Sequence, residues 1–509
     1  MYTYSDIIMA MTMVAYLALV IGVGIRYSKK NSNVDDFYLG GRQLGPLVTA
    51  MSAEASDMSS WLLLGLPGVA YLSGVADAGW TAIGLALGTY VNWFIVSKRL
   101  RVYSHKINAI TIPDFFKNRY RDDSNVLLGI SAVVIIVFFV PYTASGFAAC
   151  GKLFSSLFGM NYLTAMIVCA TCIMVYTLMG GFLAASTTDF IQSIVMTIAL
   201  IAILVFGISS AGGWDNVVAN ANSLPGYLGL TQLHDAQTGE ALPYGVLTIV
   251  STLAWGLGYF GMPHILLRFM AIEDENRLKL SRRIATVWVI ISMTIAIIIG
   301  IVGNALSAGG VVNVLEGSDS ETIIVRITGV LSALGPIPAI IAGVVIAGIL
   351  ASTMSTSDSQ LLAASSSFSQ NLCRGVFKVK MSEKTALIVA RLSVLGISVI
   401  AVFLASDPDS SVFQIVSFAW AGFGAAFGPV MLTALFWKRS NRQGATAGML
   451  VGGIMIFVWK FLVRPLGGAW DIYELLPAFI CALAAIIIVS LATPAPAKEI
   501  TDEFEGVRS

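Results

Sequence analysis

Apolar runs of about 20 residues recur along almost the whole chain, and they constrain its fold more than any other feature. A helix needs about 20 apolar residues to cross a bilayer, and the runs lack the alternation of a membrane β-barrel. We therefore expect an all-α integral membrane protein with about 13 transmembrane helices in one domain, 1–495. The predicted spans are about 6–25, 46–74, 77–97, 125–156, 161–180, 188–210, 244–270, 284–307, 338–368, 384–405, 412–437, 444–464 and 473–493.

The composition excludes several soluble classes of protein. Hydrophobic residues make up 57% of the chain and charged residues only 12%, whereas soluble domains have about 25% charged residues. A soluble enzyme, a nucleic-acid binder and a disordered scaffold are therefore disfavoured, and the net charge of +1 predicts no polyanionic partner. Cys169 and Cys172 have C-x-x-C spacing, but no second pair or nearby histidine completes a metal site.

Basic residues gather in alternate loops and predict the orientation in the membrane, because cytoplasmic loops are enriched in Lys and Arg. The opposite loops carry only Lys152, Arg326, Lys460 and Arg464. We expect a multi-pass protein of the plasma (inner) membrane with its amino-terminus outside and a cytoplasmic tail at 496–509. The basic set comprises Arg26, Lys29, Lys30, Arg42, Lys98, Arg99, Arg101, Lys106, Lys117, Arg119, Arg121, Arg268, Arg277, Lys279, Arg282, Arg283, Arg374, Lys378, Lys380, Lys384, Lys438, Arg439, Arg442, Lys498 and Arg508.

Two predicted spans are interrupted by residues that break or polarise a membrane helix. The second contains the acidic, hydroxyl-rich segment 52–61, and the seventh contains the glycine-rich segment 255–264. Simple glycine kinks are the alternative, but paired breaks in two halves are typical of inverted-repeat transporters, where freed backbone groups line a cavity. The repeats would cover about 46–210 and 244–437, with extra helices at 6–25, 444–464 and 473–493.

The ninth span carries a hydroxyl face. Ser352, Ser355, Thr356 and Ser359 recur at helical spacing, and Asp358 lies among them in an apolar segment. Small hydroxyl residues also serve as packing contacts between helices, but such packing needs no aspartate. Hydroxyl, carboxylate and carbonyl oxygens are hard ligands, so the pattern favours a small alkali cation.

Asp189 and Gln192 stand three residues apart at the predicted start of the sixth span. They face the same side of a helix, and Asp189 could contribute to an ion site. Alternatively, Asp189 merely occupies a helix amino-terminus, where the dipole favours an acid. The residues alone leave both interpretations open.

Five motifs, in this order, resemble the sodium/solute symporter family, most closely its sodium/proline symporters. The similarity runs from about residue 6 to about 495. The family has a LeuT-type, five-plus-five inverted-repeat fold, and the resemblance implies alternating-access uptake of L-proline coupled to inward Na⁺ movement, without an organic cofactor or enzymatic activity. The motifs are Leu39-Gly40-Gly41-Arg42, Ser56-Asp57-Met58-Ser59, Trp255-Gly256-Leu257-Gly258-Tyr259-Phe260-Gly261, Met354-Ser355-Thr356 and the segment 420–429.

The resemblance also implies roles for individual residues. Asp57 and Arg42 match residues needed for sodium coupling in the family. The main Na⁺ site would comprise Ala55, Met58, Ser352, Ser355 and Thr356. A second cation position would comprise Asp189, Ser355, Asp358 and Ser359. Substrate-binding positions would be Ser59, Ser60, Tyr142, Trp255, Tyr259 and Pro263.

Three residues depart from the family pattern. Ser60 stands where proline carriers have glycine, Met262 replaces a glutamine, and Asp358 is an acid where relatives have a hydroxyl. The first two departures concern selectivity, so another small amino acid or a carboxylate such as pantothenate is the alternative substrate. Asp358 makes the second cation position more anionic, which would favour Na⁺ or admit a proton instead. A solute-sensing membrane receptor is a more distant alternative, disfavoured because only about fifteen residues follow the last predicted span.

Overall fold

The structure is a computed structural model that describes residues 3–28 and 34–507. Of the basic residues used above, Lys29, Lys30 and Arg508 lie outside the described residues. The described part is a bundle of helices with one short antiparallel hairpin, in which Gln232 pairs with Pro243 and His234 with Ala241.

The elements of the first half are α1 (Tyr4–Ser28), α2 (Val34–Leu39), η1 (Gly40–Arg42), α3 (Pro46–Asp57), η2 (Trp61–Gly65), α4 (Leu66–Ser73), α5 (Val75–Val91), η3 (Asn92–Val96), α6 (Ser97–Lys106), α7 (Ile112–Arg119), α8 (Val126–Phe158), α9 (Tyr162–Ser210), α10 (Trp214–Ser223), β1 (Gln232–His234) and β2 (Ala241–Pro243).

The elements of the second half are α11 (Val246–Leu253), η4 (Ala254–Phe260), α12 (Pro263–Ala271), η5 (Glu275–Arg277), α13 (Leu278–Ala308), η6 (Gly317–Thr322), α14 (Ile323–Ser332), α15 (Pro336–Ser366), η7 (Ser367–Val376), α16 (Glu383–Leu404), α17 (Val412–Phe436), α18 (Arg442–Val458), η8 (Trp459–Val463), η9 (Arg464–Leu466), η10 (Gly468–Trp470), α19 (Leu475–Ala492) and α20 (Lys498–Glu505).

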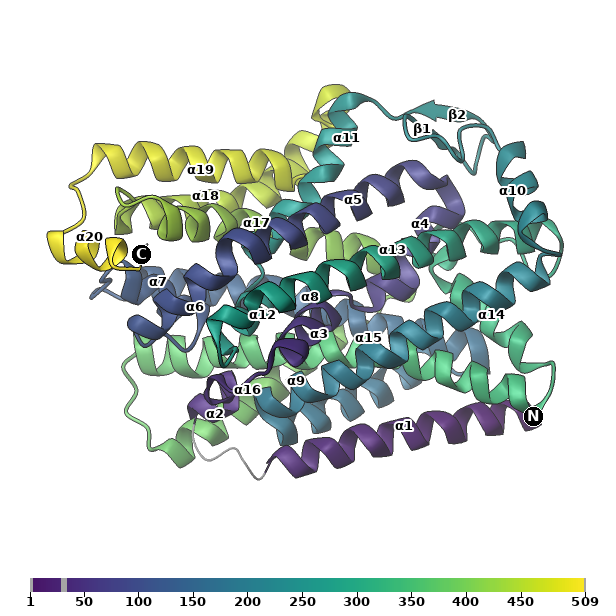
Figure 1. The fold of residues 1–509 in the computed structure, drawn as a ribbon, viewed down its shortest axis with the longest axis horizontal. Coiled ribbons are helices and arrows are strands. Elements are labelled where there is room, and N and C mark those ends of the chain that lie inside the picture. Colours follow the sequence, from purple (N-terminus) through teal and green to yellow (C-terminus); the bar gives the residue numbers. More distant parts are fainter. Residues whose placement is uncertain (1–2, 29–33, 508–509) are drawn as a thin grey trace.

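Most long helices run along a common direction, and the two ends of the chain lie at opposite ends of the bundle (Figure 1). Among the described residues, ten helices are long and apolar enough to cross a membrane, or eleven when the bent pair Val246–Phe260 and Pro263–Ala271 counts as one span. Two shorter apolar helices, Trp61–Ser73 and Tyr162–Leu178, fall in the remaining predicted spans. The predicted membrane-helix architecture is therefore confirmed, with thirteen as an approximate count.

Burial separates central helices from peripheral ones. In the apolar stretch of each helix, 72% of the residues are buried for α15 and 78% for α17, but only 22% for α1. On α1, Met11, Val14 and Leu19 project outward. Exposed apolar side chains at this density fit contact with lipid rather than with water.

The fifth and sixth predicted spans are two helices within α9 (Tyr162–Leu178 and Gly181–Ser210), joined at a kink at Gly181. This glycine has φ 65° and ψ −173°, a conformation that side-chain-bearing residues avoid. The helix resumes directly after it, so Asp189 lies about two turns inside the helix instead of at its start. The interpretation of Asp189 as a helix-terminal acid is wrong for this reason.

Candidate functional site

The second predicted span breaks after Asp57. Helix α3 ends there, Met58 takes a non-helical ψ of 65°, and a helix begins again at Trp61. The Ser59 hydroxyl accepts a hydrogen bond from the Trp61 backbone N–H at 3.2 Å, which satisfies one free donor of the new helix. The short polar segment therefore ends one helix and begins the next.

The seventh predicted span breaks between η4 and α12, where the two parts are bent by 45°. Pro263 is the first residue of α12. Proline suits this position because its missing N–H would have no partner in the first helical turn. The sequence prediction of two interrupted helices is therefore confirmed.

Glycines in the second break allow close backbone packing. A Cβ on Gly256 would lie 2.2 Å from the Gly84 carbonyl oxygen of α5. A Cβ on Gly258 would lie 2.0 Å from the Trp420 indole nitrogen of α17. Neither position can hold a larger residue without displacement, because real Cβ contacts are far longer.

Asp57 links the two breaks to each other. Its carboxylate accepts a hydrogen bond from the Tyr259 hydroxyl at 2.5 Å, and its backbone oxygen lies 3.4 Å from the Tyr142 hydroxyl. Asp57 is only 5% exposed. A buried carboxylate is costly unless it receives hydrogen bonds, so Tyr259 stabilises the charge and joins η4 to the end of α3.

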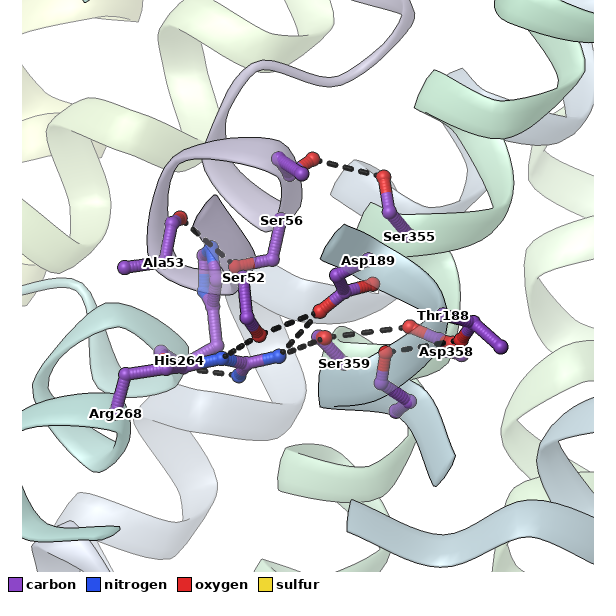
Figure 2. A network of polar contacts seen from close by, with 12 residues as sticks. Ser52, Ala53, Ser56, Thr188, Asp189, His264, Arg268, Ser355, Asp358 and Ser359 are labelled. Carbon is purple, nitrogen blue, oxygen red and sulfur yellow. Dashed lines mark hydrogen bonds and ion pairs between the residues drawn. The ribbon is translucent and has the colours of Figure 1, made fainter. Parts of the chain in front are cut away.

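A group of buried oxygens lies where α3 meets α15. The Ser355 hydroxyl is 2.8 Å from the Ala55 carbonyl oxygen and 3.2 Å from that of Ser352. The Thr356 hydroxyl is also 3.2 Å from the Ser352 carbonyl oxygen. Figure 2 shows Ser355 on α15 directed at the end of α3. Four of the five predicted Na⁺ ligands thus lie together, and Met58 stands at the adjoining break.

A second polar network surrounds Arg268 (Figure 2). Its guanidinium is 3.1 Å from an Asp189 carboxylate oxygen, 2.6 Å from the Ser359 hydroxyl and 3.0 Å from the Ser52 hydroxyl. Ser52 also donates to Asp189 at 2.7 Å, and Ser359 donates to Asp358 at 3.2 Å. Side chains of α3, α9, α12 and α15 are therefore held together inside the bundle.

The assignment of Arg268 to a loop, made from the sequence, is wrong. It lies within α12 and is 1% exposed, so it does not belong to a loop. Among the residues predicted for the second cation position, Asp189 and Ser359 bond this guanidinium directly. Ser355 instead bonds backbone oxygens of Ala55 and Ser352. In this conformation a side-chain cation already faces the predicted ion ligands.

A small central cavity adjoins the first break. Asp57, Met58, Tyr142 and Trp255 line it, together with four residues that the site prediction does not include: Trp61, Leu85, Val416 and Trp420. Trp420 is tied to the second break, since its indole N–H donates to the Trp255 carbonyl at 2.8 Å. The aromatic segment that begins at Trp420 was the sequence signal available for it.

The other predicted substrate residues flank this cavity without lining it. Tyr259 packs edge-on against Trp420, with ring centroids 5.0 Å apart. Ser59 precedes the helix that follows the first break, and Pro263 begins the helix that follows the second. The Ser60 hydroxyl is buried and has no hydrogen-bond partner among the described residues. A buried hydroxyl without a partner is costly, so it is available to a bound polar group.

Arg42 joins segments at the opposite end of the bundle from the amino-terminus. Its guanidinium donates to the carbonyl oxygens of Met270 and Ala109, each at 2.6 Å. Next to it, the Leu44 N–H donates to the Ala271 oxygen at 3.1 Å. These contacts connect the start of the first broken helix to the end of the second.

Two broken helices that meet beside buried oxygens and an aromatic cavity, in a membrane bundle, define a secondary transporter of the broken-helix class. The chain belongs to the sodium:solute symporter family, whose model matches residues 37–452. Membership places it among transporters and not among enzymes.

Known relatives resemble the chain over nearly its whole length. A high-affinity proline transporter, PutP, of Bacillus subtilis is 42% identical, covering 95% of this chain and 98% of the relative. A sodium/proline symporter of Salmonella typhimurium is 41% identical, covering 97% of this chain and 95% of the relative.

Solved structures confirm the fold class. A Na⁺-coupled sialic acid symporter, in a substrate-bound outward-open state, matches with a TM-score of 0.78 at 17% identity, over 96% of this chain and 99% of that one. Mhp1, a nucleobase-cation-symport-1 family transporter, matches with a TM-score of 0.55 at 15% identity, over 92% of this chain and 98% of that one. The likeness shows the LeuT-type fold.

Proposed function

We propose that the chain takes up L-proline by coupling it to inward Na⁺ movement through alternating access. The supporting observation is the oxygen group formed by Ala55, Ser352, Ser355 and Thr356 at the edge of the first break. These are carbonyl and hydroxyl oxygens, which suit an alkali cation, and they join the two helices that must move relative to each other. Similarity to sodium/proline symporters over nearly the whole chain supports the choice of substrate.

In the proposed mechanism, Na⁺ binds first, to oxygens of Ala55, Met58, Ser352, Ser355 and Thr356. The two hydroxyls now donate to carbonyl oxygens. On binding, they would turn their hydrogens away and present lone pairs to the ion. The ion would fix the end of α3 relative to α15 and so fix the geometry of the break. Substrate and ion would then favour each other's binding by the same factor.

The proposed substrate site combines apolar rings with polar groups at the break. Tyr142 and Trp255 line the central cavity with aromatic surface that suits the proline ring. The cavity volume is about 10 Å³ in this conformation, room for about one water, so proline binding would require the cavity to open. The Ser59 and Ser60 hydroxyls at the break suit its carboxylate. Tyr259 acts through Asp57, and Pro263 begins α12 beside the site.

A second cation position at Asp189, Ser355, Asp358 and Ser359 is part of the proposal. Arg268 occupies the polar partners Asp189 and Ser359 in this conformation. An ion arriving there would compete with the guanidinium, which would have to swing away. Occupancy would therefore couple to movement of α12 against α9 and α15.

The proposed orientation places the amino-terminus outside and the tail at 496–509 in the cytoplasm, in the plasma (inner) membrane. The uneven distribution of basic residues supports it. The Arg42 contacts would then close the cytoplasmic side and link coupling to opening there. The proposed repeats cover about 46–210 and 244–437 within the domain 1–495.

Uptake of labelled L-proline into proteoliposomes tests the function. An inward Na⁺ gradient should drive accumulation above equilibrium, whereas H⁺ or Li⁺ gradients of the same size serve as controls. Excess pantothenate and other small amino acids, added as competitors, separate proline from the alternative substrates. Failure of a Na⁺ gradient to accumulate proline would contradict the proposal.

A further inference from the structure

Tyr473 lies outside the proposed repeats but contacts the central site. It belongs to the segment 464–474 between η8 and α19. Its ring stacks on Trp255, with centroids 5.1 Å apart and planes 19° apart. Trp255 in turn lines the central cavity, so Tyr473 supports a wall of that cavity from behind.

Two hydrogen bonds fix Tyr473 to the transporter core. Its backbone N–H donates to the Ser251 hydroxyl of α11 at 2.8 Å, and its own hydroxyl donates to the Ser417 carbonyl of α17 at 2.8 Å. Tyr473 is 7% exposed. Because both ends of the residue are held, its ring has little freedom to rotate away from Trp255.

Ion pairs hold the segment that carries Tyr473. The neighbouring Glu474 is 1% exposed and pairs with Arg464 at 3.0 Å and with Lys460 at 3.6 Å. Arg464 also pairs with Asp471 at 2.8 Å. A buried carboxylate needs such partners, so the segment has a defined position rather than that of a loose loop.

The segment also borders a larger cavity. This cavity has a volume of about 1100 Å³ and is lined by Phe413, Arg464 and Glu474, among others. The Phe413 ring lies 5.6 Å from that of Trp255, which faces the central cavity. A residue that lines the larger cavity therefore contacts a residue that lines the central one.

We propose that Tyr473 is a positioning residue that sets substrate affinity and ring-size selectivity by holding the Trp255 indole against the bound amino acid. This inference rests on the proposed function. An aromatic pair contributes enough that its loss should weaken substrate binding by about two- to tenfold. A less constrained indole should also admit larger rings.

The experiment measures Na⁺-driven proline uptake and its inhibition by L-pipecolate, a six-membered-ring analogue, in Tyr473→Ala, Tyr473→Leu and Tyr473→Phe. Tyr473→Ala and Tyr473→Leu should raise the proline half-saturation concentration about two- to tenfold. They should also lower the inhibition ratio, which is the inhibition constant of pipecolate divided by the half-saturation concentration of proline. Phe keeps the stack and should restore both values to within about twofold. Tyr473→Leu provides a second test if the Tyr473→Ala variant does not insert into the membrane.

Trp470→Ala is the matched control, because Trp470 is an aromatic residue of the same segment that is 52% exposed and contacts Trp459. It should change neither value. Provided that the wild type takes up proline, an unchanged inhibition ratio in Tyr473→Ala and Tyr473→Leu would overturn the inference. So would a change in Tyr473→Phe as large as in those two variants. Absence of Na⁺-driven proline uptake by the wild type would instead overturn the proposed function and the inference with it.

Discussion

Removing the Tyr259 hydroxyl should weaken the link between the two broken helices, because this hydroxyl bonds Asp57. In Tyr259→Phe, the Asp57 carboxylate loses the donor that lies 2.5 Å from it while the aromatic ring remains. A hydrogen bond to a charged group contributes about 1.5–3 kcal/mol. This corresponds to about a 10- to 150-fold change in equilibrium. Water that enters the break can replace part of the bond, which lowers the expected effect.

We therefore expect the half-saturation concentration for proline to rise about tenfold in Tyr259→Phe at saturating Na⁺. Tyr142→Phe is the comparison, since the Tyr142 hydroxyl contacts the Asp57 backbone oxygen, at 3.4 Å, and not the Asp57 carboxylate. Its effect should stay within about threefold. Uptake is measured in proteoliposomes that contain equal amounts of each variant.

A double-mutant cycle on thermal unfolding in detergent assigns the effect to the pair and does not require activity. Tyr259→Phe should destabilise the protein clearly when Asp57 is present and only slightly in an Asp57→Ala background, which has no side-chain acceptor. Equal destabilisation in both backgrounds would refute the pairing. So would a Tyr259→Phe half-saturation concentration within twofold of the wild-type value.

Two further predictions concern packing and charge. Gly258→Ala should displace Trp420 and abolish most transport, because the added Cβ would lie 2.0 Å from the indole nitrogen. Gly453→Ala, whose added Cβ would have nothing within 4 Å, should transport normally. Uptake and membrane insertion of the two variants check this, and equal activity would contradict the close approach. Arg268→Gln should lose about 3–5 kcal/mol of stability, because it leaves the buried Asp189 charge unpaired. Adding Asp189→Asn should recover much of this loss. Unfolding in detergent measures both variants, and no recovery in the double variant would show that the unpaired charge is not the cause.

The sequence predicted the features that depend on local chemistry. The apolar runs identified the membrane helices, and the polar and glycine-rich segments located both breaks. The spacing of Ser352, Ser355 and Thr356 predicted their shared face. These features follow from length, helical periodicity and backbone conformation, which a single sequence records directly.

Features that depend on contacts between distant segments were not predictable in this way. Arg268 follows an apolar run and resembles a loop residue, yet its partners Asp189 and Ser359 lie 79 and 91 positions away. Tyr473 lies in a link outside the expected repeats, although it stacks on Trp255. The partner of a buried charge or ring is chosen by the tertiary arrangement, and no spacing rule along the chain reveals it.

The dependence of proline uptake on Na⁺ concentration in Ser355→Ala and Thr356→Ala tests the central claim most directly. Each change removes one hydroxyl from the oxygen group between α3 and α15. We predict that the Na⁺ half-saturation concentration rises about tenfold or more in each variant at equal protein insertion, because an interaction with a charged group is lost. An unchanged Na⁺ dependence in both variants would contradict the proposed site.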